Sequence, residues 1–360
     1  MKIAFRTDAS DLIGTGHFMR CITLADKLKK HSVKIRFISR DLPQHLMEIL
    51  NLKGFEYTPL KKVFTKELID ELPHARWLGT SQIKDARETI QALADNIWDW
   101  IVVDHYALDE RWEKIIINSV RQLMVIDDLA NRRHNCDVLL DQNLNRNEAE
   151  YKKLVPKKCD LFVGVRYALI REEFWKLRNK KKIHNTSVKK NILIFFSGAD
   201  VNNYTGRTLE TLSTKEFDGI NVDVVIGADN KFSEEIKLKC NNFNFRCHIQ
   251  TNQMAEFMHK SDLFIGAGGG SINERIFMKL PSVAIAVSSN QIEPLEKLSQ
   301  TGSCVYLGPG ESLSDINFKK SILYALQHIE FLTKKSEKLC AEFILDQTQL
   351  LERLLIKRLR

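Results

Sequence analysis

The 360-residue chain has no apolar segment of the length that would insert into or cross a membrane. Its first residues, MKIAFRTDAS, pass directly into polar sequence, whereas a signal peptide needs about 7–15 apolar residues behind its basic start. The longest apolar runs, such as Ile192–Phe196 and Val283–Val287, have the length of a strand and fall short of the roughly 20 residues that span a bilayer. We therefore expect a cytoplasmic protein without stable membrane association.

Close cysteine pairs are also missing. The chain has 7 cysteines, but no two are spaced as CxxC, so the sequence predicts no structural zinc site. Their odd number and scattered positions favour reduced thiols over a disulfide framework. The composition, 44% hydrophobic and 28% charged, excludes disordered, collagen-like and small disulfide-stapled proteins.

A surplus of positive charge is present, with 54 Lys and Arg against 46 Asp and Glu. Much of the surplus lies in RNKKKIHNTSVKK at 178–190 and in LLERLLIKRLR at 350–360. No aromatic residue separates the lysines of the first run, which favours a solvated linker over a surface that binds nucleic acid. The leucines of the second run recur at helical spacing, and we expect them to pack on the protein body rather than on a membrane.

Strand-length apolar runs alternate with helical patterns in two successive series. The first series starts at Lys2–Phe5, and the second starts at Asn191–Phe196, after the linker. This order predicts an α/β fold with two Rossmann-like, doubly wound parallel-sheet domains, at 1–180 and 190–330, and a helical tail at 331–360. Such sheets bind ligands at the carboxyl ends of their strands, so we expect the site in an interdomain cleft.

The loop after the first strand carries Gly14, Gly16 and His17 at the start of a helix. Glycine allows a ligand to approach the backbone closely, and a helix start offers free N–H groups to phosphate or sugar oxygens. The positive end of the helix dipole disfavours imidazolium, so we expect His17 to be neutral and able to act as a general base. A histidine that only hydrogen-bonds the nearby backbone fits the same residues.

A second glycine loop, Gly266–Ser271, follows the strand Leu263–Ile265 and precedes a helix. This order suits a diphosphate held on backbone N–H groups, although the lysine of a P-loop is absent. Glu274, in the first turn of that helix, would accept hydrogen bonds from ribose hydroxyls or would merely favour the helix dipole. Asn290 and Gln291 follow the next strand and suit sugar hydroxyls, while helix capping explains Asn290 equally well.

Polar residues also follow the other strands, and each is as compatible with a structural role as with a functional one. They are Arg6, Asp8, Asp104, His105, Tyr106, Asp127, Asp128, Asn143, Ser197 and Asp200. The adjacent Asp127 and Asp128 have no third ligand at a telling spacing, so we predict no metal site.

Several segments occur in a characteristic order over residues 1–300. They are FRTDASDLIGTGHFMRCITLA at 5–25, VDHY at 103–106, IDD at 126–128, YALIREEF at 167–174, and the second glycine loop with Glu274, Asn290 and Gln291. Together they resemble the UDP-2,4-diacetamido-2,4,6-trideoxy-β-L-altropyranose hydrolases of pseudaminic acid biosynthesis. More distantly the chain is similar to the lipid-linked GlcNAc transferase of peptidoglycan synthesis, and both families have the two-domain glycosyltransferase-B (GT-B) architecture. The chain departs from the hydrolases at 272–276, where it reads INERI instead of a WERC-like stretch.

The resemblance implies a metal-independent hydrolase without a cofactor. Water would attack the anomeric carbon with inversion, activated by His17, and UDP and the free 6-deoxy sugar would leave. The glycine loop would hold UDP, with Glu274 on the ribose. The residues that would contact the substrate are Arg6, Asp8, Gly14, Gly16, Tyr106, Gly268, Gly269, Gly270, Ser271, Glu274, Asn290 and Gln291.

Two other functions fit the same sequence. One is a GT-B glycosyltransferase with a UDP-sugar donor, and the other is a non-catalytic module that binds nucleotide sugars. A lipid acceptor would call for an exposed apolar and basic patch, and none is evident in the N-terminal half. We expect a monomer whose partner is the small UDP-sugar, with no nucleic acid bound.

Overall fold

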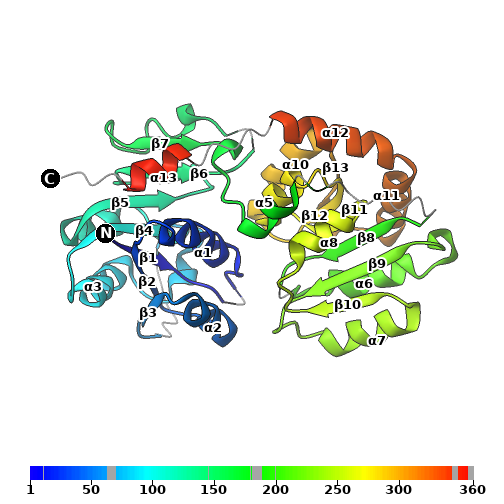
Figure 1. The fold of residues 1–360 in the computed structure, drawn as a ribbon, viewed down its shortest axis with the longest axis horizontal. Helices are drawn as coiled ribbons and strands as arrows, with labels where there is room; N and C mark the ends of the chain where they lie inside the picture. Colours follow the sequence, from blue (N-terminus) through cyan, green and yellow to red (C-terminus); the bar gives the residue numbers. More distant parts are fainter. Residues whose placement is uncertain are drawn as a thin grey trace. The chain divides into compact units, whose positions relative to one another are not determined.

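The computed structural model of the chain (Figure 1) describes residues 1–10, 12–62, 70–144, 146–178, 180, 189–198, 200–342 and 348–355. The chain forms two compact units. The first unit comprises Met1–Leu169 together with Leu345–Arg360, and the second comprises Ile170–Ile344.

The first unit is a parallel sheet with strands in the order β3-β2-β1-β4-β5-β6-β7. The strands are β1 (Lys2–Thr7), β2 (Lys34–Ser39), β3 (Glu56–Pro59), β4 (Trp98–Asp104), β5 (Val120–Ile126), β6 (Val138–Asp141) and β7 (Asp160–Val163). The helices are α1 (Gly16–Lys29), α2 (Gln44–Lys53), α3 (Gln82–Leu93), α4 (Glu110–Ile116) and α13 (Thr348–Leu355), and a short 3₁₀ turn, η1, spans Ala75–Leu78.

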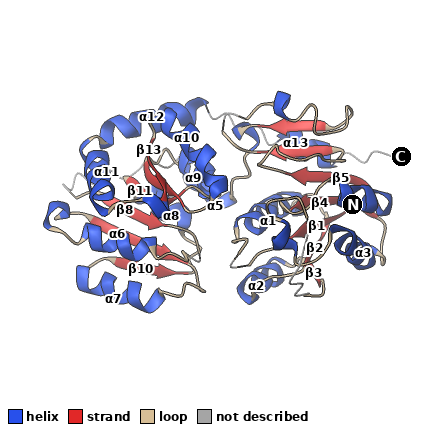
Figure 2. Ribbon diagram, turned by 180° about the vertical axis from the view of Figure 1, so that it is seen from behind, coloured by secondary structure: helices blue, strands red, loops and turns tan. Residues whose placement is uncertain are grey.

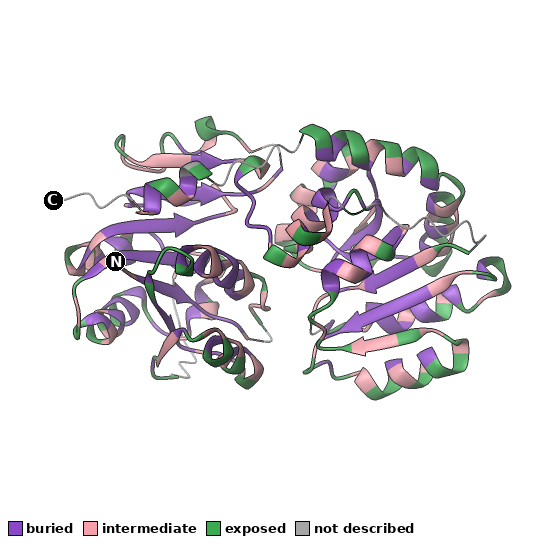
Figure 3. Ribbon diagram, viewed as in Figure 1, coloured by how far each residue is buried: buried purple, intermediate pink, exposed green. Residues whose placement is uncertain are grey.

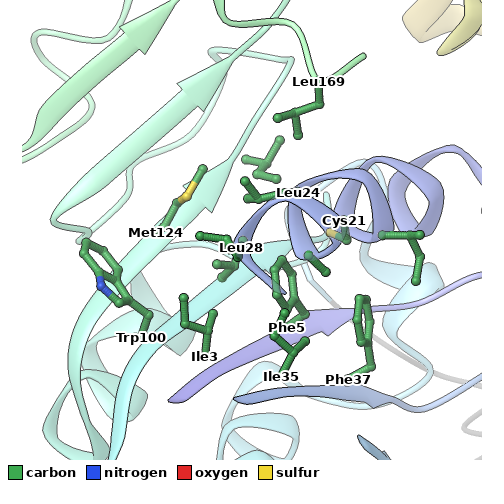
Figure 4. Close-up of a cluster of buried hydrophobic side chains, with 14 of the residues drawn as sticks. Ile3, Phe5, Cys21, Leu24, Leu28, Ile35, Phe37, Trp100, Met124 and Leu169 are labelled. Atoms are coloured by element: carbon green, nitrogen blue, oxygen red, sulfur yellow. The ribbon is translucent and has the colours of Figure 1, made fainter. Parts of the chain in front are cut away.

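Both faces of this sheet are covered, because successive residues of a strand point to opposite sides. Ile3 and Phe5 pack against Leu24 and Leu28 of α1 (Figure 4), whereas Ala4 belongs to the separate apolar cluster on the other face. Burial on both faces explains why the strands read as continuous apolar runs in the sequence.

The C-terminal helix α13 packs on the first unit. Leu350 and Leu354 are fully buried in the same cluster as Phe5. Arg353 pairs with Asp160, and its guanidinium lies 5.2 Å from the centre of the Trp100 ring. The leucines of this basic segment up to residue 355 therefore pack on the first unit, as expected.

The second unit is a parallel sheet with strands in the order β10-β9-β8-β11-β12-β13. The strands are β8 (Asn191–Phe195), β9 (Asn221–Ile226), β10 (Arg246–Ile249), β11 (Leu263–Ala267), β12 (Ser282–Ala286) and β13 (Cys304–Pro309). The helices are α5 (Glu172–Arg178), α6 (Tyr204–Leu212), α7 (Ser233–Phe243), α8 (Met254–Lys260), α9 (Ser271–Phe277), α10 (Ile292–Gln300), α11 (Asp315–Gln327) and α12 (Ile329–Glu342). Helices lie on both faces of each sheet (Figure 2), and most strands are buried along their length (Figure 3).

The strand order locates the places where a ligand is expected. In the first sheet the order reverses between β1 and β4, and in the second it reverses between β8 and β11. Loops that follow such neighbouring strands diverge to opposite faces of the sheet and leave a crevice at the strand ends. The two glycine loops identified in the sequence follow β1 and β11, so each lies at one of these switch points.

The predicted fold class, two doubly wound parallel sheets, is confirmed. The units divide the chain somewhat differently from the expected limits of 1–180, 190–330 and 331–360. Helix α5 belongs to the second unit, and the tail is shared, since α12 belongs to the second unit and α13 to the first. The expected linker at 178–190 lies, except for residues 178, 180, 189 and 190, outside the described residues.

All 7 cysteines are free thiols in this structure. None of the helices within the described ranges combines the length and the apolar character needed to span a bilayer.

Candidate active site

His17 is the second residue of α1 and directly follows the loop between β1 and α1. Gly14 in that loop has a φ of +74°, a left-handed conformation that residues with a side chain rarely adopt, so glycine is favoured there. The neighbouring strand β4 ends at Asp104, which is in register with Thr7 of β1. The switch point of the first sheet thus places an imidazole beside a carboxylate.

Nδ1 of His17 lies 2.6 Å from Oδ1 of Asp104. Burial opposes ionisation of Asp104, but the charges of Arg20 and His17 outweigh it and hold the pKa of this carboxyl well below its usual range. An ionised Asp104 accepts the Nδ1 proton, which fixes the tautomer and leaves Nε2 as an acceptor. Nε2 has no hydrogen-bond partner among the residues that the structure describes. The geometry is that of an oriented general base.

Arg20 connects this pair to a second carboxylate. Its Nε donates to Oδ2 of Asp104 at 2.5 Å, and its Nη1 donates to Asp128. The hydroxyl of Tyr106 donates to the same Asp128 oxygen at 2.8 Å. Arg20 was not among the expected site residues, although its position three residues after His17 places both on one face of α1.

Aromatic rings border His17. The Tyr106 ring stands edge-on to the imidazole at 4.4 Å, and Trp77 of η1 stacks on Tyr106 at 5.5 Å. His74 lies 4.5 Å from Trp77 and 5.2 Å from Tyr106. We call His74, Trp77 and Tyr106 the aromatic wall. Tyr106 is buried, while His74 and Trp77 are partly exposed. His74 and Trp77 were missed in the sequence because they follow no strand and lie in no periodic pattern.

Arg6 and Asp8 lie beneath this site and are fully buried. The guanidinium of Arg6 donates two hydrogen bonds to Asp8, at 2.7 and 2.9 Å, and two to Asp85 of α3, at 3.0 and 2.7 Å. The backbone N–H of Arg40 donates to Asp8 at 2.6 Å. These contacts occupy the polar atoms of Arg6 and favour a role in supporting the loop over contact with a ligand.

A further carboxyl cluster lies at the ends of β5 and β6. The Tyr151 hydroxyl is 2.8 Å from Oδ2 of Asp141 and 3.0 Å from Oδ2 of Asp127. Burial and the charge of Asp128 raise the pKa of Asp141 to about 7, although Nε of Arg146 lies 3.5 Å away. Asp141 therefore changes its charge near neutral pH.

In the second unit, the glycine loop after β11 is held at its base. Oε1 of Gln291 accepts hydrogen bonds from the N–H groups of Gly268 and Val287, both at 3.1 Å. A side chain at Gly268 would collide with Leu295, whose Cγ would lie 2.4 Å from the new Cβ. Gly269, Gly270 and Ser271 are partly or fully exposed, and their N–H groups have no acceptor within the described ranges. These N–H groups are available to an anion.

Glu274 of α9 is held by Arg171. The guanidinium donates from Nε to Oε1 at 2.6 Å and from Nη2 to Oε2 at 3.0 Å. Burial disfavours the charge on Arg171, but Glu274 outweighs this effect and the pKa of Arg171 is raised. Arg171 belongs to the YALIREEF segment and is 103 positions from Glu274. Sequence spacing could not have revealed this contact.

The remaining expected residues differ in their surroundings. Gly16 begins α1 directly before His17. Asn290 lies in an exposed turn, where its Oδ1 accepts a hydrogen bond from the Ser288 hydroxyl at 2.6 Å. Within the described residues, no three His, Cys, Asp or Glu side chains are arranged to hold a metal ion.

No protein-family profile matches the chain. The chain is 26% identical, over 305 residues, to the UDP-2,4-diacetamido-2,4,6-trideoxy-β-L-altropyranose hydrolase of Campylobacter jejuni, a match that covers 84% of this chain and 97% of that protein. It is also 26% identical over 314 residues to an uncharacterized protein of Methanocaldococcus jannaschii, covering 84% of this chain and 60% of that protein's length.

Solved structures share the fold over nearly the whole chain. MurG of Acinetobacter baumannii has a TM-score of 0.64 at 12% identity and covers 98% of this chain and 99% of its own. The glycotransferase of kitacinnamycin has a TM-score of 0.66 at 13% identity, with 99% of each chain covered. The spinosyn rhamnosyltransferase SpnG, complexed with thymidine diphosphate, has a TM-score of 0.63 at 13% identity, and the match covers 98% of this chain and 100% of its own. At such identities the likeness establishes the two-domain, Rossmann-like GT-B fold and nothing finer.

Proposed function

We propose that this protein hydrolyses UDP-2,4-diacetamido-2,4,6-trideoxy-β-L-altropyranose to UDP and free 2,4-diacetamido-2,4,6-trideoxy-L-altrose. The observation that carries the proposal is the His17–Asp104 pair, with Nδ1 on a buried carboxylate and Nε2 without a described partner. The similarity to the Campylobacter jejuni hydrolase, which extends over 97% of that protein, supports the choice of reaction and substrate.

In the proposed step, Nε2 of His17 takes a proton from a water molecule as the water oxygen forms a bond to the anomeric carbon C1. The bond from C1 to the phosphate oxygen breaks on the opposite side, and UDP leaves with the electron pair. The configuration at C1 is inverted. Asp104 stays ionised and stabilises the imidazolium that forms.

The second unit would hold the leaving group. The exposed N–H groups of Gly269, Gly270 and Ser271 suit the oxygens of a diphosphate, because backbone dipoles stabilise the negative charge that UDP carries as it leaves. Glu274, oriented by Arg171, suits the ribose hydroxyls. His17 belongs to the first unit, and the expected UDP-binding residues belong to the second.

The decisive experiment is turnover in ¹⁸O-labelled water. We expect the pure protein to release UDP without an added acceptor, to place the label on the sugar and not on UDP, and to give the inverted anomer first in the NMR spectrum. His17→Ala should lower kcat by about 10²–10⁴-fold and leave the dissociation constant for UDP unchanged.

Other outcomes identify the competing functions. Release of UDP only after an acceptor is added would identify a glycosyltransferase, and tight binding without turnover would identify a binding module. Label on UDP would contradict attack at C1. An unchanged kcat for His17→Ala would overturn the assignment of the base.

A further inference from the structure

Arg275 of α9 is a buried cation without a direct ion pair among the described residues, although the charges of Cys304 and Glu274 act on it through space. Its side chain is 1% exposed, and its only hydrogen bond within the described ranges runs from Nη1 to the carbonyl oxygen of Ala267, at 3.2 Å. Nε and Nη2 have no partner, and no described carboxylate pairs with the guanidinium. The Phe264 ring, 4.4 Å away, offers a weak cation–π contact. By contrast, the neighbouring Glu274 is fully engaged with Arg171.

A cation in this position destabilises the folded protein, because removing a charge from water costs free energy unless a partner of opposite charge offsets it. Burial lowers the pKa of Arg275 to about 10, which still leaves it protonated at neutral pH. A cavity of about 10 Å³ lies beside Arg275 and is lined also by Ser282, Ser303 and Ser336, whose hydroxyl is likewise unpartnered. Such a cavity holds one water molecule, which supplies hydrogen bonds but no charge.

The side chain of Arg275 contacts the base of the glycine loop. The peptide that Arg275 contacts joins Ala267 to Gly268, and its N–H donates to Gln291 at 3.1 Å. This peptide at the base of the loop is therefore held by two hydrogen bonds. The Arg275 guanidinium donates to its carbonyl oxygen, and the amide oxygen of Gln291 accepts from its N–H. The next three N–H groups along the chain, from Gly269 to Ser271, are those that the proposed function assigns to the diphosphate.

We propose that Arg275 is a positioning residue whose buried charge is balanced by the phosphate groups of a nucleoside diphosphate bound on the glycine loop. The inference rests on the proposed function and extends it. Arg275 does not touch the ligand. It orients the base of the loop and contributes a positive potential that reaches the ligand through a medium of lower dielectric constant than water. The same buried charge lowers the stability of the ligand-free protein and raises its affinity for the anion.

The test compares three ligands by calorimetry on the intact chain: UDP, inorganic pyrophosphate and uridine. Arg275→Met removes the charge and keeps the length of the side chain. We expect this variant to bind UDP and pyrophosphate about tenfold more weakly and to bind uridine with unchanged affinity. Its unfolding temperature should stay the same or rise. Arg275→Lys, which retains the charge, should keep UDP affinity within about threefold.

Arg246→Met is the control, since Arg246 lies on the edge strand β10, three strands away from β11, and pairs with Asp223 of β9. It should leave all three affinities unchanged. If Arg275→Met does not fold, Arg275→Gln removes the charge and retains hydrogen-bonding capacity, and the same ligand comparison applies.

Undiminished binding of UDP and pyrophosphate by the uncharged variant would overturn the inference, as would an equal loss for uridine. The proposed function fails separately if the wild-type protein binds pyrophosphate but not UDP, because the effect of Arg275 on pyrophosphate is then still measured. If the wild-type protein binds neither anion, both proposals are wrong.

Discussion

Oδ1 of Asp104, the last residue of β4, lies 2.6 Å from Nδ1 of His17, the second residue of α1. The two residues are 87 positions apart and meet only because β1 and β4 are neighbours in the sheet. The tautomer of the histidine is set by this contact, and with it the nitrogen that can take a proton.

Asp104→Asn should therefore lower kcat for UDP release by about 10²–10⁴-fold. The amide carries no charge to stabilise imidazolium, and its NH₂ group can donate to Nδ1 and so place the proton on Nε2. Kinetics at saturating substrate, with UDP binding measured in parallel, provide the check. Asp26→Asn, at a partly exposed carboxylate of α1, is the control and should keep the wild-type kcat. Wild-type turnover by Asp104→Asn would show that the pair does not act as the base.

The Arg171–Glu274 ion pair predicts a ribose-specific effect. Arg171→Met frees Glu274 to rotate, so we expect the affinity for UDP to fall about 5–30-fold, while that for 2′,3′-dideoxy-UDP is unchanged. Glu274→Gln should show the same pattern, and the double variant should lose no more than either single one. Glu173→Gln is the control, because Glu173 contacts Arg171 but not Glu274. An equal loss for both nucleotides would contradict the prediction.

The partly exposed rings of the aromatic wall should contribute to binding of the sugar. Trp77→Ala removes an apolar face beside His17, so KM should rise about tenfold, with a smaller change in kcat and no change in the dissociation constant for UDP. Trp77→Phe should recover most of the loss. Steady-state kinetics with the intact UDP-sugar measure the effect, and Phe331→Ala, an exposed aromatic on α12, is the control. An unchanged KM would show that the wall does not contact the sugar.

Asp141 predicts a dependence of stability on pH. Its pKa is about 7 in the folded state against an ordinary 3.8, so between these values the folded state holds a proton that the unfolded state has lost. The free energy of unfolding should accordingly fall as the pH rises from about 4 through 7. Asp141→Asn mimics the protonated form and should be close to the wild type near pH 4 and exceed it by about 3–4 kcal/mol at pH 8.

Urea unfolding at the two pH values tests this prediction. Asp26→Asn again serves as a control and should shift the free energy of unfolding by a similar small amount at both pH values. A variant at position 141 that is less stable than the wild type at pH 8 would contradict the raised pKa.

Local sequence patterns were sufficient to predict the fold class and the two loops. Parallel strands buried on both faces must be apolar throughout, so runs such as Ile192–Phe196 are visible without a structure. The positive φ of Gly14 favours glycine at that position, and close packing against Leu295 excludes a side chain at Gly268. The order of strand, glycine loop and helix could therefore be read from neighbouring residues.

The partners of the expected residues depended on the tertiary structure. His17 meets Asp104, and Glu274 meets Arg171, because strands and helices that are distant in the chain become adjacent. Arg6 and Asp104 both follow strands and look alike in the sequence, yet Arg6 is hydrogen-bonded to two buried carboxylates, whereas Asp104 contacts the histidine.

The sequence by itself determined the α/β class, the glycine loops and the presence of a histidine at a helix start, since each follows from residues close together in the chain. Only the tertiary structure decided which polar side chains pair with one another, which remain available to a ligand, and that Arg275 is buried with its Nε and Nη2 unpartnered. Pairing and burial are properties of long-range packing, and charged residues of the same type look identical until that packing is known.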